Sequence, residues 1–177
     1  MTALSLIRLG NPILRKKSRQ VTKRELRSET FQQFLDELAV LCLLKSGVGI
    51  AAPQVGVSKR VIVVNIDSKN PRYPGRKAFP LTIIINPKII RHSSEMFEDW
   101  EGDLSVDLRG IVSRFVTCEV VGLDRNGHEI RFRLTNDFHS RVFQHEIDHL
   151  DGVMFVDRVH DTKTLSEYAE WKRYWKR

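Results

Sequence analysis

The sequence predicts a mixed fold of α-helices and antiparallel β-strands. Apolar residues recur at helical spacing in two segments, and several other segments are short runs rich in Val and Ile, which favour strands. Asn126-Gly127 stands between two such runs and is a strong signal for a hairpin turn, which makes those strands antiparallel. The chain of 177 residues has enough material for one core, so we expect a single domain over residues 1–177.

The first long helix is expected from Thr30, which suits an N-cap, to a stop at Gly47. Two strands are expected next, over residues 60–66 and 81–90, because both segments are rich in Val and Ile. A loop rich in Pro, Lys and Arg separates these strands. The apolar residues at helical spacing in the first helix are Phe31, Phe34, Leu35, Leu38, Leu41 and Cys42.

The hairpin strands are expected over residues 115–123 and 129–134, on either side of the Asn-Gly turn. A second helix is expected from Asn136 to Gly152, with two histidines on the side that carries its apolar residues. A last helix is expected over residues 162–175, and its basic end suits the negative end of the helix dipole.

The composition indicates an intracellular protein. Cys42 and Cys118 are its only cysteines, too few for a disulfide scaffold, and both are expected to fill apolar core positions. No apolar run approaches the length of about 20 residues that crosses a bilayer, and the first eight residues lack a secretory signal. We therefore expect a cytoplasmic protein, or a protein of an organelle matrix if the source is eukaryotic.

Residues 145–149 form an HExxH motif on the second predicted helix. The i, i+4 spacing puts His145 and His149 on one helical face, where both imidazoles can bind one metal ion. Glu146 can then reach a water molecule activated by that ion and act as a general base. A catalytic site of this type needs a third protein ligand, and the sequence offers three sources for it.

The three sources match the sequence unequally. A third histidine downstream would complete an extended motif, but that position is Phe155. Glu167 or Glu170 on the last predicted helix could serve instead, although both suit a solvated helix face. The third source is residues 95–107, which hold six Asp and Glu without one Lys or Arg. This segment is either a solvated acidic loop or a loop that approaches the metal through Asp103, and residue types alone favour neither.

Three separated motifs resemble, in the same order, those of the peptide deformylases. Residues 47–54 read GVGIAAPQ, residues 101–105 read EGDLS, and residues 144–149 read QHEIDH. The likeness extends from residues 13–15 to Phe155 and so covers most of the chain. It implies an α+β fold in which antiparallel strands wrap around the central HExxH helix, with an N-terminal and a C-terminal helix, in agreement with the predicted elements.

The resemblance implies hydrolysis of the N-formyl group from the initiator formyl-methionine of new polypeptides, with release of formate. One divalent metal ion, Fe²⁺ or Zn²⁺, would be the cofactor, and Glu146 would be the acid and base. The other roles implied by position are metal ligands Asp103, His145 and His149, oxyanion donors Gln54 and the Leu104 backbone N–H, and substrate-binding residues Gly47, Val48, Gly49 and Arg109.

The sequence departs from the family pattern at the third metal ligand, where the resemblance implies a cysteine thiolate and this chain has Asp103. A carboxylate keeps the charge of the thiolate, and two histidines with one carboxylate are a common ligand set of non-haem Fe(II). The harder ligand set, which has no thiolate to oxidise, bears on metal preference, oxygen tolerance and rate. Two other functions stay open: a deformylase-like binding protein with weakened catalysis, and a zinc peptidase that uses Glu167 or Glu170.

The charge of the chain suggests a further partner. The formal net charge is +7 at pH 7, and residues 1–30 hold eight Lys and Arg against two Glu. Such a balance also occurs in transit peptides, but the resemblance assigns this segment to the domain itself. Because nascent chains emerge at the ribosome, the basic N-terminal segment and residues 172–177 could dock on ribosomal RNA, or they could be ordinary solvated surface. The expected substrate is a formyl-methionyl peptide, with no membrane and no DNA as partner.

Overall fold

The computed structural model describes residues 4–176, so Met1–Ala3 and Arg177, which belong to the two basic terminal segments, lie outside it. The α-helices are α1 (Lys23–Leu26), α2 (Glu29–Leu44), α3 (Asp137–Leu150) and α4 (Tyr168–Tyr174), and the 3₁₀-helices are η1 (Pro12–Arg15), η2 (Ala52–Val55), η3 (Phe155–Arg158) and η4 (Thr162–Thr164). The strands are β1 (Gly49–Ala51), β2 (Val61–Ile66), β3 (Phe79–His92), β4 (Met96–Asp103), β5 (Val106–Phe115), β6 (Cys118–Leu123), β7 (Glu129–Leu134) and β8 (Ser166–Glu167).

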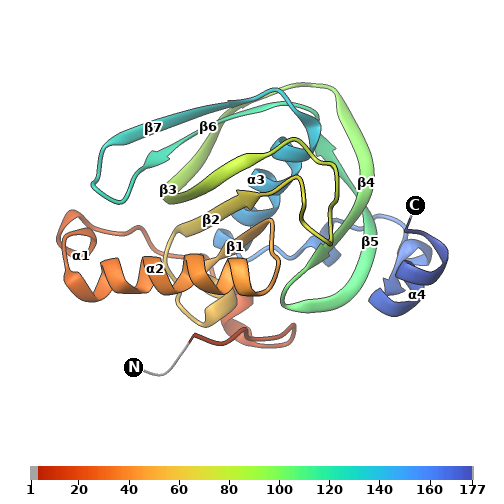
Figure 1. Ribbon diagram of the computed structural model, residues 1–177, viewed down its shortest axis with the longest axis horizontal. Coiled ribbons are helices and arrows are strands. Elements are labelled where there is room, and N and C mark those ends of the chain that lie inside the picture. Colours follow the sequence, from red (N-terminus) through yellow and green to blue (C-terminus); the bar gives the residue numbers. More distant parts are fainter. Residues whose placement is uncertain (1–3, 177) are drawn as a thin grey trace.

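The strands form two antiparallel sheets. One has the strand order β1-β2-β3-β6-β7, and the other has the order β4-β5-β8. Helix α3 contacts β1, β2 and β3 of the first sheet and β5 of the second, and Figure 1 shows it enclosed by the strands. The expected α+β fold with strands around the HExxH helix is therefore confirmed. Within residues 4–176, no helix is long and apolar enough to span a membrane.

The apolar face of α2 packs on the first sheet, as its spacing predicts. Leu35 and Leu38 are fully buried in a cluster that also holds Ile50 of β1 and Val61 of β2. The expected start at Thr30 is wrong, because the helix begins at Glu29 with Ser28 in the extended N-cap position. A second cluster joins α3 to the same sheet, so the core lies on both sides of the short strand β1.

The strand predictions in the first sheet hold with small changes. Strand β7 has the expected bounds, and the hairpin turns through Gly127, whose φ of 88° is one that glycine adopts without strain. The expected strand over residues 115–123 is instead two segments, because β5 ends at Phe115 and β6 begins at Cys118. This break lets the chain leave one sheet and enter the other.

The acidic segment at residues 95–107 is neither kind of loop that the sequence suggested. It forms β4 and the first residues of β5. Side chains in β4 alternate between faces, so that Glu101 and Asp103 are buried while Glu98 is exposed. Two arginines of other elements, Arg114 and Arg141, neutralise Glu101 from within the fold, which the local run of acidic residues does not reveal.

The expected last helix over residues 162–175 is also wrong in extent. The Asp161 side chain accepts a hydrogen bond from the Lys163 backbone N–H and so fixes the short turn of η4. After Leu165, Ser166 and Glu167 are extended in β8, because they pair with Arg109 and Leu108 of β5. Only α4 is helical, and its Trp171 is buried.

Candidate metal centre

Two histidines on α3 form the base of the site. The helix begins after Asn136, whose side chain accepts a hydrogen bond from the His139 backbone N–H at 3.1 Å. The i, i+4 spacing then brings the His145 and His149 Nε2 atoms to within 3.2 Å of each other. Both side chains are buried, and both Nε2 atoms point to the same place.

Asp103 at the end of β4 supplies a carboxylate to these histidines. Its Oδ2 lies 3.1 Å from His149 Nε2 and 3.8 Å from His145 Nε2. Its Oδ1 accepts hydrogen bonds from the Ser105 backbone N–H at 2.6 Å and from Gln54 Nε2 at 2.8 Å. Burial alone would raise the pKa of Asp103, but the histidines and the Ser105 N–H hold it at about 2. The carboxylate is therefore ionised, with one oxygen fixed by the fold and the other facing the histidines.

The donor set fits a divalent transition metal ion. One ligand atom from each of Asp103, His145 and His149 lies within 4.8 Å of the others. Among the described residues, Asp103 Oδ2 is a buried polar atom without a hydrogen-bond donor. Two imidazole nitrogens and one carboxylate oxygen suit Zn²⁺ or Fe²⁺, and three protein ligands leave a coordination position for a substrate or water.

Glu101 links the site to the rest of the fold. Its carboxylate accepts hydrogen bonds from Arg114 Nε and Nη2 at 2.8 and 2.9 Å and from Arg141 Nη1 at 2.7 Å. It also pairs with His145 Nδ1 at 3.0 Å. Burial would raise the pKa of Glu101, but the two contacts with Arg114 and the contact with His145 keep it well below its ordinary range. This buried carboxylate therefore stays ionised.

The contact with Glu101 also orients His145. A proton on Nδ1 donated to Glu101 leaves the lone pair of Nε2 directed at Asp103 and His149. Burial would lower the pKa of His145, but the hydrogen bond and charge of Glu101 and the charges of nearby carboxylates raise it to about 9. Binding of a metal ion to this imidazole therefore displaces a proton.

Glu146 is held against the backbone of β1. A Cβ atom added at Gly49 would lie 2.3 Å from Glu146 Oε1, so only glycine lets the carboxylate approach this strand. Its Oε2 is buried without a hydrogen-bond partner among the described residues. Burial raises the pKa of Glu146 to about 7, although the two histidines oppose the shift. A carboxyl group in this state can both accept and release a proton near neutral pH.

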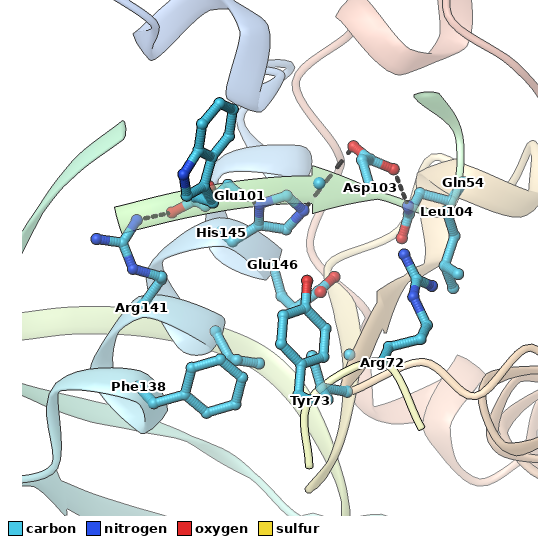
Figure 2. A pocket seen from close by; sticks show the side chains of 15 residues that line it. Gln54, Arg72, Tyr73, Glu101, Asp103, Leu104, Phe138, Arg141, His145 and Glu146 are labelled. Carbon is cyan, nitrogen blue, oxygen red and sulfur yellow. Dashed lines mark hydrogen bonds and ion pairs between the residues drawn. The ribbon is translucent and has the colours of Figure 1, made fainter. Parts of the chain in front are cut away.

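A cavity opens next to these groups, and Figure 2 shows its lining. Val48 and Gly49 of the segment around β1 lie on its wall, together with Phe138 and Val142 of α3. Gln54 and Leu104 also line it beside Asp103. No acceptor for the Leu104 backbone N–H is found within residues 4–176, so this N–H is available to a ligand.

The predicted site residues do not all line this cavity. Gly47 is not on its wall but lies behind it, where a Cβ atom would meet the Leu104 side chain at 3.1 Å. Arg109 faces a neighbouring cavity instead. Glu167 and Glu170 are exposed, and neither belongs to the group of ligand atoms around His145. Their position gives no support to a third ligand from the C-terminal segment.

Several lining residues, among them Arg72, Tyr73 and Arg141, are not among the site residues that the sequence predicted. Arg72 and Tyr73 come from the loop between β2 and β3, and Arg141 comes from α3. The Tyr73 ring packs on Phe138 with 5.2 Å between centroids, which holds the loop on the cavity. A loop rich in Pro, Lys and Arg carries no local signal of such a position, since it depends on contacts across the chain.

Comparisons with known proteins agree on one family. The model of the polypeptide deformylase family matches residues 3–165. Peptide deformylase 2 of Nostoc is 47% identical over 171 residues, covering 94% of this chain and 93% of the relative. A chloroplastic peptide deformylase 1A of tomato is 35% identical and covers 87% of this chain and 58% of the relative. The crystal structure of a class I type b peptide deformylase of Acinetobacter baumannii with bound Met-Ala-Ser has a TM-score of 0.84 and 40% identity, covering 89% of this chain and 99% of that chain.

Proposed function

This chain belongs to the peptide deformylase family, and on that premise we propose that Asp103, His145 and His149 hold the metal ion of a metal-dependent hydrolase of the N-formyl group. The observation that carries this assignment is the convergence of three buried ligand atoms within 4.8 Å, beside a buried glutamate. Residues 1–177 would act as one deformylase domain.

The residues around the ion have distinct proposed roles. When bound, the ion supplies Lewis-acid chemistry, which acidifies water and polarises a carbonyl group. Glu146 accepts a proton from the attacking water and passes it to the amine that leaves. Gln54 Nε2 and the Leu104 N–H donate hydrogen bonds to the formyl oxygen as negative charge develops on it. Gln54 is pre-oriented for this, because its Oε1 accepts a hydrogen bond from the Ala51 N–H at 2.8 Å.

The substrate is proposed to lie along β1. Gly49 leaves the backbone open to a peptide, and Val48, Phe138 and Val142 offer an apolar surface for the methionine side chain. Gly47 would support this path from behind by its close contact with Leu104.

The identity of the metal follows from the proposed ligands. With Asp103 in place of a thiolate, the donor set is two imidazoles and one carboxylate, which suits Fe²⁺ as well as Zn²⁺. The Asp103→Cys variant tests this preference. We expect it to keep a metal ion but to shift activity between iron-loaded and zinc-loaded protein and to gain sensitivity to oxygen. An unchanged metal profile would mean that Asp103 does not set the preference.

Two further proposals concern the surroundings of the enzyme. We propose that its basic N-terminal segment and residues 172–177 contact ribosomal phosphates, and that it works in the cytoplasm or in an organelle matrix. Co-sedimentation with ribosomes is the test of the first. An electrostatic contact should weaken steeply as salt rises, and co-sedimentation that does not depend on salt would exclude it.

The decisive experiment for the reaction is the Glu146→Gln variant. Its amide keeps the shape of the side chain but cannot accept the proton, so we expect normal metal content and a loss of deformylation of about 100-fold or more. Glu170→Gln is the matched control, because this glutamate is exposed and outside the ligand group. Retained activity in Glu146→Gln would remove this residue from the mechanism.

A further inference from the structure

A second cavity lies beside the candidate metal centre. Its volume is about 250 Å³, and Arg72, Asp103 and Leu104 line both it and the central cavity. Arg109 and Tyr168 line the second cavity but not the central one. The second cavity therefore adjoins the proposed reaction site, and the side chains of Arg72 and Arg109 both line it.

Arg109 is buried without an ion-pair partner among the described residues. Only 3% of the residue is exposed, and no hydrogen bond or ion pair of its guanidinium is found within residues 4–176. The group stacks instead on the rings of Tyr168 and Trp171, whose centroids lie 4.9 and 5.2 Å from its Cζ. On its other side lies Gly102, where a Cβ atom would fall 0.9 Å from Arg109 Nη1. The fold therefore holds this cation in place but leaves its N–H donors unused.

Arg72, which is half-buried, lines the same cavity and also lacks an ion-pair partner among the described residues. Its backbone N–H donates to Asn70 Oδ1 at 2.9 Å, and the next residue, Tyr73, packs on α3, so the backbone is anchored on both sides. No hydrogen bond or ion pair of its side chain is found among the described residues. Figure 2 shows the side chain directed toward Leu104. Burial lowers the pKa of Arg109 and the charge of Arg72 adds to this shift, whereas Tyr73, Tyr168 and Asp103 oppose it.

The carboxylates on the wall form no ion pair with Arg72 or Arg109 among the described residues, although the charge of Asp103 acts on Arg109. Asp103 gives Oδ1 to Ser105 and Gln54, and its other oxygen faces the histidines. Asp107 is exposed and pairs with Arg8 across 3.8 Å, and Arg8 itself donates to the Leu104 carbonyl at 3.1 Å. A buried guanidinium without an ion-pair partner, with a second cation on the same cavity, favours the binding of an anion between them.

We propose that Arg72 and Arg109 form a binding site for a carboxylate next to the metal centre. Guanidinium groups bind carboxylates through paired, charge-assisted hydrogen bonds, and a cavity of this size admits a small carboxylate. The inference rests on the proposed function, which supplies two sources of this group. One is the formate that the reaction releases beside Leu104, and the other is a carboxylate carried by the peptide substrate.

A formate titration tests the site without any turnover. Metal-loaded wild-type protein is titrated with sodium formate while tryptophan fluorescence is followed, because Trp171 lies against Arg109. Sodium chloride at equal ionic strength is the blank. We expect Arg72→Gln to weaken the affinity about tenfold, since one of the two charged donors is lost. Arg109→Lys keeps the positive charge but loses the paired N–H donors of the guanidinium group, so it should weaken the affinity for formate as well.

Arg76→Gln is the matched control. Arg76 lies on the same loop, but its guanidinium is already paired with Asp99 at 3.4 Å, and it does not line the second cavity. The same loss of one positive charge should therefore leave formate affinity within about twofold of the wild type.

Peptide kinetics separate the two sources. If the carboxylate comes from the substrate, kcat/KM is higher for short formyl-methionyl peptides with a free C-terminus than for the amidated peptides, and Arg72→Gln abolishes this preference. If it is formate, only the titration responds to Arg72→Gln. The inference is overturned if Arg72→Gln and Arg76→Gln have the same formate affinity and the same preference in kcat/KM for peptides with a free C-terminus. If the wild-type protein binds formate through Arg72 but does not deformylate formyl-methionyl peptides, the proposed function alone is overturned.

Discussion

Replacement of Glu101 by glutamine tests how strongly one buried carboxylate holds the site together. The carboxylate accepts three hydrogen bonds from Arg114 and Arg141 and pairs with His145 at 3.0 Å. Glutamine keeps the size of the side chain but leaves the two buried cations without this charge. Breaking a buried ion pair from one side costs about 3–5 kcal/mol, which corresponds to a fall in Tm of roughly 10 °C for a chain of this length. Because His145 loses its orienting partner, metal affinity should also fall about 10-fold to 100-fold.

Thermal unfolding followed by circular dichroism and metal titration of the same protein measure both effects. Glu98→Gln is the control, since Glu98 lies on the same strand but its side chain is more than half exposed and pairs with the exposed His160. Its Tm should change by less than about 2 °C. If Glu101→Gln unfolds at the same temperature as Glu98→Gln, the buried ion-pair network around Glu101 does not stabilise the fold.

Three further changes test separate parts of the structure. Gly49→Ala places a Cβ atom 2.8 Å from Glu146 Cγ and so displaces this side chain. We expect kcat/KM to fall about 100-fold while metal content stays normal. Unchanged kinetics would contradict the close contact between Gly49 and Glu146. Burial raises the pKa of Cys42 to about 12 and also raises the pKa of Cys118, so both thiols are protonated at pH 8. Both should therefore react with a thiol reagent only after unfolding. Rapid reaction of the native protein would contradict their burial. Gln144→Ala removes the acceptor that lies 3.1 Å from the Phe115 backbone N–H, while the Phe115 C=O keeps the Ser140 hydroxyl as a donor at 2.9 Å. The loss should cost about 1–2 kcal/mol in denaturant unfolding, and an unchanged midpoint would show that water replaces the lost acceptor.

The parts of the fold that the sequence predicted are those with a strong local pattern. The apolar stripe of α2, the Asn-Gly turn and the capped HExxH helix each depend on residues close in sequence, and each is found. Strand β4 was missed because its acidic residues disfavour a strand locally. It exists because Glu101 meets cations from β5 and α3, which are 13 and 40 residues away in sequence. The C-terminal helix was predicted too long because the pairing of β8 with β5 overrides helical spacing.

In the candidate site too, the sequence predicted the features that depend on local spacing but not those that depend on contacts across the chain. The spacing of His145 and His149 was sufficient to place both on one face of a helix, and the structure brings Asp103 to them from β4. The roles of Glu101 and Arg72 could not be derived from spacing. Glu101 acts through contacts across the molecule, and Arg72 comes from a loop whose position depends on Tyr73 packing against α3.

The metal content of Asp103→Ala tests the proposed centre most directly. Protein purified without oxygen is analysed for iron and zinc beside wild-type protein expressed in the same way. Since Asp103 would supply one of three protein ligands, the ratio of metal to protein should be near one in the wild type and should fall by a large factor in the variant, with deformylation of a formyl-methionyl peptide falling in parallel. Full metal occupancy in Asp103→Ala would contradict the assignment and would mean that the third ligand lies elsewhere.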